Sequence, residues 1–269
     1  MIDSSPMETA ERFQFGENWS RFLSVVDEER ISHASGRLRD LVGDLTGKSF
    51  LDVGSGSGIH SLAALRLGAT RVLSFDYDAK SVACANELKQ RFAPLASWEV
   101  LQGSALDRDF LSSLGLFDVV YSWGVLHHTG NLRESLKLIT IPAANMLVLA
   151  LYDDQGRWSR FLHRWKKLYV NSPSAAQRIM ELLTFCATWG KAFVAKPLST
   201  KKKWDLYGEQ RGMSPWHDIV DMAGGYPFEV MRPGEVFSSF HERGFQLEKM
   251  NTVVRHGLNE FVFIKSTLA

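Results

Sequence analysis

The sequence predicts an α/β protein in which helices cover both faces of a parallel, doubly wound sheet. From Phe50 onward, short apolar runs of strand length alternate with segments whose apolar residues recur at helical spacing. The run Asn145–Tyr152 is apolar almost throughout, as expected of a central strand that is covered on both faces. A chain of 269 residues suffices for one large domain of this class, or for a core with a substantial cap.

The composition narrows the range of partners. With 31 basic and 30 acidic residues, the chain has no charge excess suited to a polyanion, so we expect no nucleic acid. Cys84 and Cys186 form no CxxC pair, which argues against disulfide and zinc sites. We find no signal peptide and no apolar run of bilayer length, and we expect a soluble cytoplasmic protein without a membrane partner. The sequence is compatible with a homodimer.

Residues 1–46 look mostly helical and lie outside the sheet pattern. Phe15, Trp19 and Phe22 recur at three- and four-residue spacing, which indicates a helix fixed to the core by its aromatic side chains. A functional interpretation is that Trp19 and its neighbour Asn18 close over a cofactor. The two interpretations are compatible.

The core, residues 47–156, begins with a strand that runs into a glycine loop. Asp52 stands near the strand end, and Gly54, Ser55, Gly56 and Gly58 form the loop before a helix that stops at Gly68. Glycines let the backbone turn tightly and approach a ligand closely. A strand, a glycine turn and a helix in this order predict a nucleotide-binding corner.

Two carboxylates refine that prediction. The second strand, Arg71–Phe75, ends in Asp76, where a Rossmann-type sheet places an acceptor for both ribose hydroxyls. Tyr77 is placed to lie against an adenine face, although an edge tyrosine that only packs is an equal alternative. Asp52, just before the glycines, suits a cationic ligand better than a pyrophosphate.

The pattern Asp-Val-Gly-Ser-Gly-Ser-Gly resembles motif I of the class I S-adenosylmethionine (SAM) methyltransferases, whose acidic residue helps to hold the amino acid end of SAM. The chain as a whole resembles the small-molecule members often grouped with ubiquinone-biosynthesis O-methyltransferases. The resemblance implies SAM as cofactor and a Rossmann-like sheet of seven mostly parallel strands. The sequence motifs that carry this resemblance include Phe-Gly-Glu-Asn-Trp, Ser-Phe-Asp-Tyr-Asp, Tyr-Ser-Trp-Gly-Val-Leu-His-His-Thr-Gly, Arg-Gly-Met-Ser and Gly-Gly-Tyr-Pro-Phe-Glu.

The ends of the later strands supply further candidates. The third strand, Ser97–Gln102, leads to Ser104 and Ala105, where such folds recognise the adenine edge; many relatives carry aspartate in place of Ser104. The fourth strand, Phe117–Ser122, leads into a loop from Trp123 that should face the reaction chamber. We therefore count Ser122 and Trp123 among the cofactor-binding candidates.

His127 and His128 lie in the same loop and are candidate bases. Adjacent side chains diverge from extended or helical backbone, so we expect at most one of them to act. Packing against the cofactor or in the core is the alternative. Tyr152, at the end of the fifth strand, is a further catalytic candidate.

Residues 157–232 interrupt the alternation with several helices, which we interpret as a lid. His217 beside Asp218 is another candidate base there. Residues 233–269 should complete the core with a helix, Pro233–Arg243, and two antiparallel strands, Phe245–Met250 and Glu260–Lys265.

Three functions are compatible with these patterns. The first is in-line methyl transfer from SAM to a small molecule, with His127, His128 or His217 as base and, since no acidic ligand cluster stands out, without a metal. The second is cyclisation of SAM, as in methyltransferase-like azetidine-2-carboxylate synthases, which release methylthioadenosine; the shielding residues would be Trp19, Trp123, Tyr152, Tyr226 and Asn131. The third is a SAM-binding subunit without turnover.

Overall fold

The computed structural model describes residues 13, 15–211, 215–252 and 257–266, with the side chains of residues 17, 18, 20, 21, 205–211 and 217 left undescribed. The chain divides into two compact units. One unit comprises Gly16–Gln155 and Glu229–Ala269, and the other comprises Met1–Phe15 and Gly156–Phe228.

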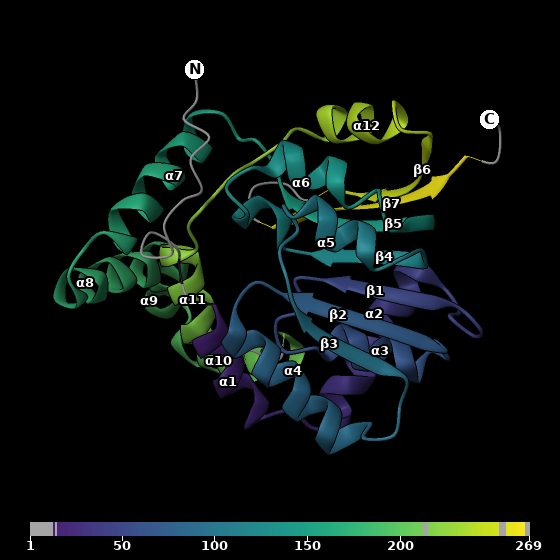
Figure 1. Ribbon diagram of the computed structural model, residues 1–269. Helices are drawn as coiled ribbons and strands as arrows, with labels where there is room; N and C mark the ends of the chain where they lie inside the picture. Colours follow the sequence, from purple (N-terminus) through teal and green to yellow (C-terminus); the bar gives the residue numbers. More distant parts are fainter. Residues whose placement is uncertain (1–12, 14, 212–214, 253–256, 267–269) are drawn as a thin grey trace. The chain divides into compact units, whose positions relative to one another are not determined.

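The first unit contains a seven-stranded sheet in the order β3-β2-β1-β4-β5-β7-β6 (Figure 1). The strands are β1 (Ser49–Val53), β2 (Arg71–Asp76), β3 (Trp98–Gln102), β4 (Phe117–Trp123), β5 (Ala143–Tyr152), β6 (Phe245–Asn251) and β7 (Leu258–Lys265). Strands β1 to β5 pair in parallel, whereas β7 runs antiparallel to β5 and to β6. The predicted, mostly parallel sheet with a final antiparallel pair is confirmed.

Helices cover both faces of this sheet, and adjacent strand residues point alternately into two separate cores. One core lies under α1 (Gly16–Leu23), α2 (Glu28–Val42), α3 (Ile59–Arg66) and α4 (Ala79–Phe92). The other lies under α5 (Arg108–Ser113), α6 (Leu132–Leu138) and α12 (Pro233–His241). Phe50 faces the first core and its neighbour Leu51 the second, so both faces of β1 are dry. The doubly wound arrangement leaves the strand ends as the place for a ligand.

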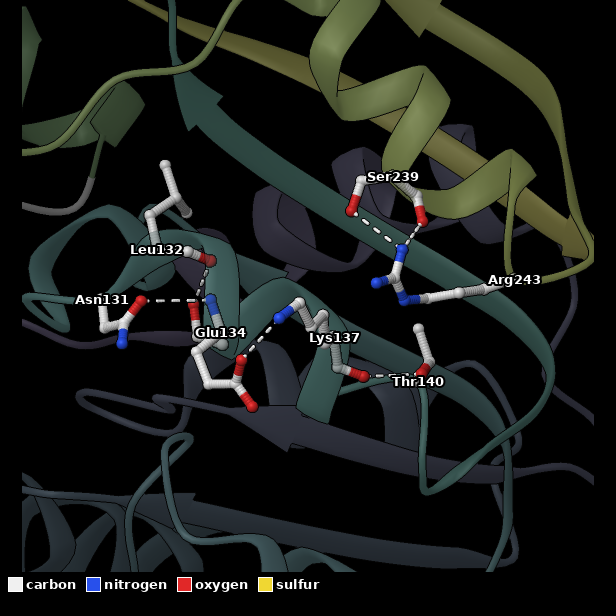
Figure 2. Close-up of polar contacts among 8 residues, drawn as sticks. Asn131, Leu132, Glu134, Lys137, Thr140, Ser239 and Arg243 are labelled. Carbon is white, nitrogen blue, oxygen red and sulfur yellow. Dashed lines mark hydrogen bonds and ion pairs between the residues drawn. The ribbon is translucent and has the colours of Figure 1, made fainter.

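Helix α6 follows the turn that carries the two histidines, and Figure 2 shows polar contacts of this helix. The Asn131 side chain accepts a hydrogen bond from the Glu134 amide at 3.3 Å and so caps the helix, and Lys137 pairs with Glu134 at 2.9 Å. Just after α12, the Arg243 guanidinium donates to the carbonyl oxygen of Ser239 on that helix. Asn131 is exposed, and its shielding of a ligand stays a prediction.

The second unit is helical where described. Its elements are α7 (Arg157–Val170), α8 (Ser174–Phe185), a π-helical turn η3 (Cys186–Gly190), α9 (Lys191–Ala195), α10 (Pro197–Arg211) and α11 (Pro215–Gly224). Lys166 is buried and donates from Nζ to the carbonyl oxygens of Asp221 and Met222 at the end of α11. Burial lowers the pKa of Lys166 to about 8. No helix within the described ranges is both long and apolar enough to cross a bilayer.

Candidate functional site

The glycine loop after β1 has the backbone that the sequence predicts. Gly54, Gly56 and Gly58 have φ angles of 75°, 53° and 79°, which L-residues with a side chain rarely adopt. A Cβ added at Gly54 would lie 2.2 Å from Cγ1 of Val125. The Gly54 and Ser55 amides donate to the Phe75 carbonyl oxygen at 2.8 and 3.1 Å, which ties the loop to the end of β2.

Trp19 lies directly against this loop. A Cβ added at Gly56 would be 2.7 Å from Cε2 of the Trp19 indole, so only glycine leaves room for the ring. Trp19 also meets Phe22 edge to face at 6.0 Å between ring centroids. The helix therefore packs on the core as predicted, whereas closure of Trp19 and Asn18 over a cofactor stays a prediction.

Helix α1 is held in place by Asp78. One carboxylate oxygen accepts from the Gly16 amide at 2.9 Å, and the other accepts from the Lys80 amide at 2.8 Å. Asp78 therefore caps α4 and fixes the start of α1 with the same side chain. The sequence analysis had not singled out this residue.

Replacing Asp78 with alanine should loosen α1 and cost about 1 kcal/mol from the lost cap of α4. Asp107→Ala is a matched control, since Asp107 caps α5 through the Phe110 amide at 3.0 Å. We expect similar losses of thermal stability in both variants, but faster proteolysis within residues 16–23 only in Asp78→Ala. Equal proteolysis at α1 in both variants would contradict the anchoring role.

Asp76 lies at the end of β2, facing the glycine loop. Its Oδ2 accepts from the Gly56 amide at 2.9 Å, and its Oδ1 accepts from the Asp78 amide at 2.9 Å. Burial raises the pKa of Asp76 to about 6, while the two amide hydrogen bonds act in the opposite direction. The carboxylate is thus fixed at the strand end where the sequence places a ribose acceptor.

Asp52 is buried one strand away and accepts a hydrogen bond from the Ser61 hydroxyl at 2.7 Å. Burial, with the charge of Asp76, raises the pKa of Asp52 to about 7, while the hydrogen bonds from Ser61 act in the opposite direction. A cation placed beside these two carboxylates would favour their ionised forms. Ser61, on the first turns of α3, was missed by the sequence analysis, although its position in the helix could have been read from the glycine motif.

The other predicted cofactor residues lie at the ends of neighbouring strands. Tyr77 is half exposed after β2, and Ala105 is buried after β3. The Ser104 hydroxyl accepts from the Leu106 amide at 3.1 Å, and the Ser122 hydroxyl donates to the Val53 carbonyl oxygen at 3.1 Å. The hydroxyls of Ser104 and Ser122 thus already make local hydrogen bonds, which fix the turn after β3 and join β4 to β1.

Trp123, at the end of β4, belongs to an aromatic cluster. Its ring stacks on Tyr121 at 6.0 Å and 12°, and the Arg37 guanidinium lies 5.2 Å from its centroid. His60 lies 5.1 Å from Tyr121, and burial lowers the pKa of His60 to about 4 with a further contribution from the charge of Arg37. His60 is therefore neutral at pH 7 and adds no positive charge beside Asp52.

The candidate bases His127 and His128 gather with Tyr152. The histidines lie in a 3-10 turn, η2 (Leu126–His128), with ring centroids 4.3 Å apart, and Tyr152 lies 4.3 Å from His127. The expectation that at most one of these histidines acts stays a prediction, and the two rings meet edge to face at an interplanar angle of 67°. His127 is only 1% exposed, whereas His128 is partly exposed.

Glu229 fixes the histidine turn from the far end of the chain. Its amide donates to the His127 carbonyl oxygen at 2.9 Å, and its Oε2 accepts from the Leu132 amide at 2.9 Å. The backbone amide of Glu229 therefore holds the turn, and its side chain holds the start of α6. The sequence analysis had noted Glu229 only as part of the Gly-Gly-Tyr-Pro-Phe-Glu word.

Two candidates belong to the second unit. The backbone of His217 lies in α11, and its side chain falls outside the described side chains. Tyr226 is buried and meets the ring of His163 edge to face at 5.5 Å. Among the described residues, no group of three or more His, Cys, Asp or Glu side chains is arranged to hold a metal ion.

The residues at the glycine loop fit a cationic nucleoside. Among the described residues, the Ser55 hydroxyl is buried without a hydrogen-bond partner, which leaves a donor and acceptor available within the loop. The glycines keep the loop backbone bare, and the two buried carboxylates supply negative charge. The carboxylates and the hydroxyl are complementary in hydrogen bonding and charge to the ribose, the amino group and the sulfonium of SAM.

Comparison with known proteins agrees with this assignment. Residues 51–140 match the family model of the methyltransferase domain, a stretch that includes the glycine loop, Asp76 and both adjacent histidines. An alignment 138 residues long with the ribosomal protein L11 methyltransferase of Pelotomaculum thermopropionicum is 30% identical and covers 45% of this chain and 44% of that protein. A second alignment, with the protein of the same name from Serratia proteamaculans, is 44% identical over 96 residues. It covers 36% of this chain and 30% of that protein. The chain thus spans less than half the length of these curated relatives.

Solved structures share the fold over nearly the whole chain. Magnesium protoporphyrin IX methyltransferase from Synechocystis PCC 6803, solved with bound SAH, has a TM-score of 0.56 at 16% identity, over 93% of this chain and 94% of that one. An O-methyltransferase family protein from Burkholderia thailandensis has a TM-score of 0.57 at 11% identity, over 99% of this chain and 66% of that one.

The protein therefore has the Rossmann-like fold of the class I methyltransferases. Residues 51–140 match a methyltransferase domain, and the fold is one that SAM-dependent methyltransferases share.

Proposed function

We propose that this protein transfers a methyl group from SAM to a small-molecule acceptor. The observation that carries the proposal is the Asp76 carboxylate hydrogen-bonded to the Gly56 amide at 2.9 Å, with buried Asp52 on the neighbouring strand. Asp76 would accept the ribose hydroxyls, and Asp52 would face the amino acid end of SAM. The adenine would lie beside Tyr77, Ser104 and Ala105.

The protein's part in methyl transfer is to align the acceptor and exclude water. SAM supplies the electrophilic methyl group on its sulfonium, so the chain itself needs little covalent chemistry. Trp19 against the glycine loop offers an aromatic side chain to a cationic sulfur. The Trp123 ring already lies against Tyr121 and the Arg37 guanidinium. Ser55 offers its free hydroxyl within the loop.

We propose His128 as the base that takes the acceptor's proton. It is partly exposed, whereas His127 is almost fully buried between His128 and Tyr152. His127 and Tyr152 would then position the His128 ring, and Glu229 would fix the backbone of the turn. His217 stays an alternative base from α11.

The names of similar proteins support a small acceptor over a protein. The Synechocystis and Burkholderia proteins, which share the fold over nearly the whole chain, are a porphyrin methyltransferase and an O-methyltransferase family protein. The ribosomal protein L11 methyltransferases match less than half of the chain. We place the acceptor among small molecules with an ionisable hydroxyl or amine.

Product analysis tests this function. Purified protein is incubated with SAM alone, with a panel of phenols and amines, and with ribosomal protein L11, and the nucleoside product is identified by mass spectrometry. We expect S-adenosylhomocysteine only when a small acceptor is present. Methylthioadenosine from SAM alone would assign the cyclisation instead, methylation of L11 would assign a protein substrate, and tight binding without any product would indicate a subunit without turnover.

SAM affinity should depend on pH through Asp52. Its pKa of about 7 reflects a carboxylate that is partly protonated near neutrality, and a bound cation favours the ionised form. Affinity should therefore rise by about tenfold between pH 6 and pH 8, and Asp52→Asn should remove most of this rise. Titration calorimetry at both pH values measures the effect; a slope retained in Asp52→Asn would contradict the assignment.

A further inference from the structure

Helix α7 carries a concentration of positive charge that the chain as a whole does not. The whole chain has a formal net charge of +1, yet α7 contains no acidic residue. Its exposed basic residues are Arg157, Arg160, Arg164 and Lys167. This helix is therefore locally cationic.

The same helix exposes large apolar side chains. Trp158, Phe161 and Leu168 are 45%, 49% and 58% exposed, and the rings of Trp158 and Phe161 stack at 5.2 Å. Their spacing of three and seven residues places them along one stripe of the helix. Isolated exposed apolar residues are ordinary, but a stripe of this size on one helix marks an interaction surface.

The two sets of exposed side chains lie next to each other around α7. At about 100° per residue, the apolar stripe occupies one edge of the exposed surface and the basic residues occupy the adjacent edge. The opposite side is already packed, since Ser159, Lys166 and Tyr169 are buried. We define the α7 surface as the exposed residues Arg157, Trp158, Arg160, Phe161, Arg164, Lys167 and Leu168.

We propose that the α7 surface docks the protein on an anionic lipid bilayer. Aromatic and aliphatic side chains enter the boundary between headgroups and acyl chains, while Arg and Lys reach the lipid phosphates and carboxylates. A helix lying in the interface needs no membrane-spanning length. The proposal departs from the sequence-based expectation that the protein has no membrane partner.

Charge favours lipid over a second copy of the chain as the occupant. In a twofold contact the same surface meets itself, so the basic edge of α7 would face another basic edge. Like charges brought together in this way oppose association. Anionic headgroups provide the complementary charge and also accept the apolar stripe.

Vesicle flotation of the full chain tests the proposal without any acceptor, so its outcome is independent of the proposed activity. The probes are vesicles of phosphatidylcholine alone and vesicles with about 30% phosphatidylserine. We expect binding to the anionic vesicles that weakens with added salt, and little binding to the neutral ones. Phe161→Gln should weaken vesicle binding by about tenfold. Arg160→Gln and Arg164→Gln should each weaken it by about fivefold.

Matched controls keep the result specific. Leu95→Gln removes an apolar side chain that is 99% exposed, and Lys202→Gln removes an exposed cation from α10; both should bind vesicles like the unmodified protein. Circular dichroism and SAM uptake verify that each variant is folded. No binding to anionic vesicles, equal binding to neutral vesicles, or unchanged binding by the α7 variants would overturn the proposal, as would light scattering that shows a dimer lost in Phe161→Gln.

Discussion

Replacing Gly54 with alanine is expected to destabilise the protein by about 2–5 kcal/mol and to abolish SAM binding. Two costs add at this position. A left-handed backbone with φ of 75° costs a residue with a side chain about 1–2 kcal/mol. The new methyl group would also lie 2.2 Å from Val125 Cγ1, and crowding in a packed region costs about 1–3 kcal/mol.

Gly115→Ala separates these costs. Gly115 has nearly the same φ, 74°, but nothing lies within 4 Å of a Cβ built on it. Chemical denaturation should therefore show a loss for Gly115→Ala that reflects backbone strain alone. Val125→Ala combined with Gly54→Ala should recover part of the difference, because the nearest clashing methyl group is removed. Equal losses for the two single variants would mean that the Gly54 loop adjusts freely around an added side chain.

Replacing Asp76 with asparagine should weaken SAM binding by about tenfold to a hundredfold, the range for lost hydrogen bonds to a charged group. The asparagine loses the charge and presents an NH2 group to either the ribose or the Gly56 amide, which Asp76 Oδ2 now accepts at 2.9 Å. Both the ligand contact and the loop conformation are affected. Titration of SAM into each variant measures the effect.

Asp109→Asn is the control for Asp76→Asn. Asp109 is an exposed aspartate in the first turn of α5, so the change removes the same charge away from the glycine loop. We expect its SAM affinity to equal that of the unmodified protein. Unchanged affinity in Asp76→Asn as well would show that the ribose is held elsewhere.

Much of the core follows from local sequence signals. Helix α4 begins at Ala79 because the Asp78 side chain, an Asp directly before the helix, caps it through the Lys80 amide. Strands β1 to β5 were predictable because their apolar runs are short, continuous and bounded by turn residues. The positive φ angles of Gly54, Gly56 and Gly58 likewise follow from the residue type and the motif.

Contacts between distant residues explain what the sequence did not show. Val125 packs over Gly54. Glu229 contacts the start of α6 at Leu132, from which it is 97 residues away along the chain. Neither contact has a periodic or spacing signal. The helix cap at Asn131, in contrast, has a local sequence signal, because an asparagine followed three residues later by Glu134 is typical of a helix start.

A crystal structure of the protein with S-adenosylhomocysteine is the most direct measurement of where the nucleoside binds. We expect both ribose hydroxyls on the Asp76 carboxylate and the amino acid end beside Asp52 and the glycine loop. A nucleoside bound away from the ends of β1 and β2, or crystals that take up none at saturating concentration, would contradict the assignment of this site.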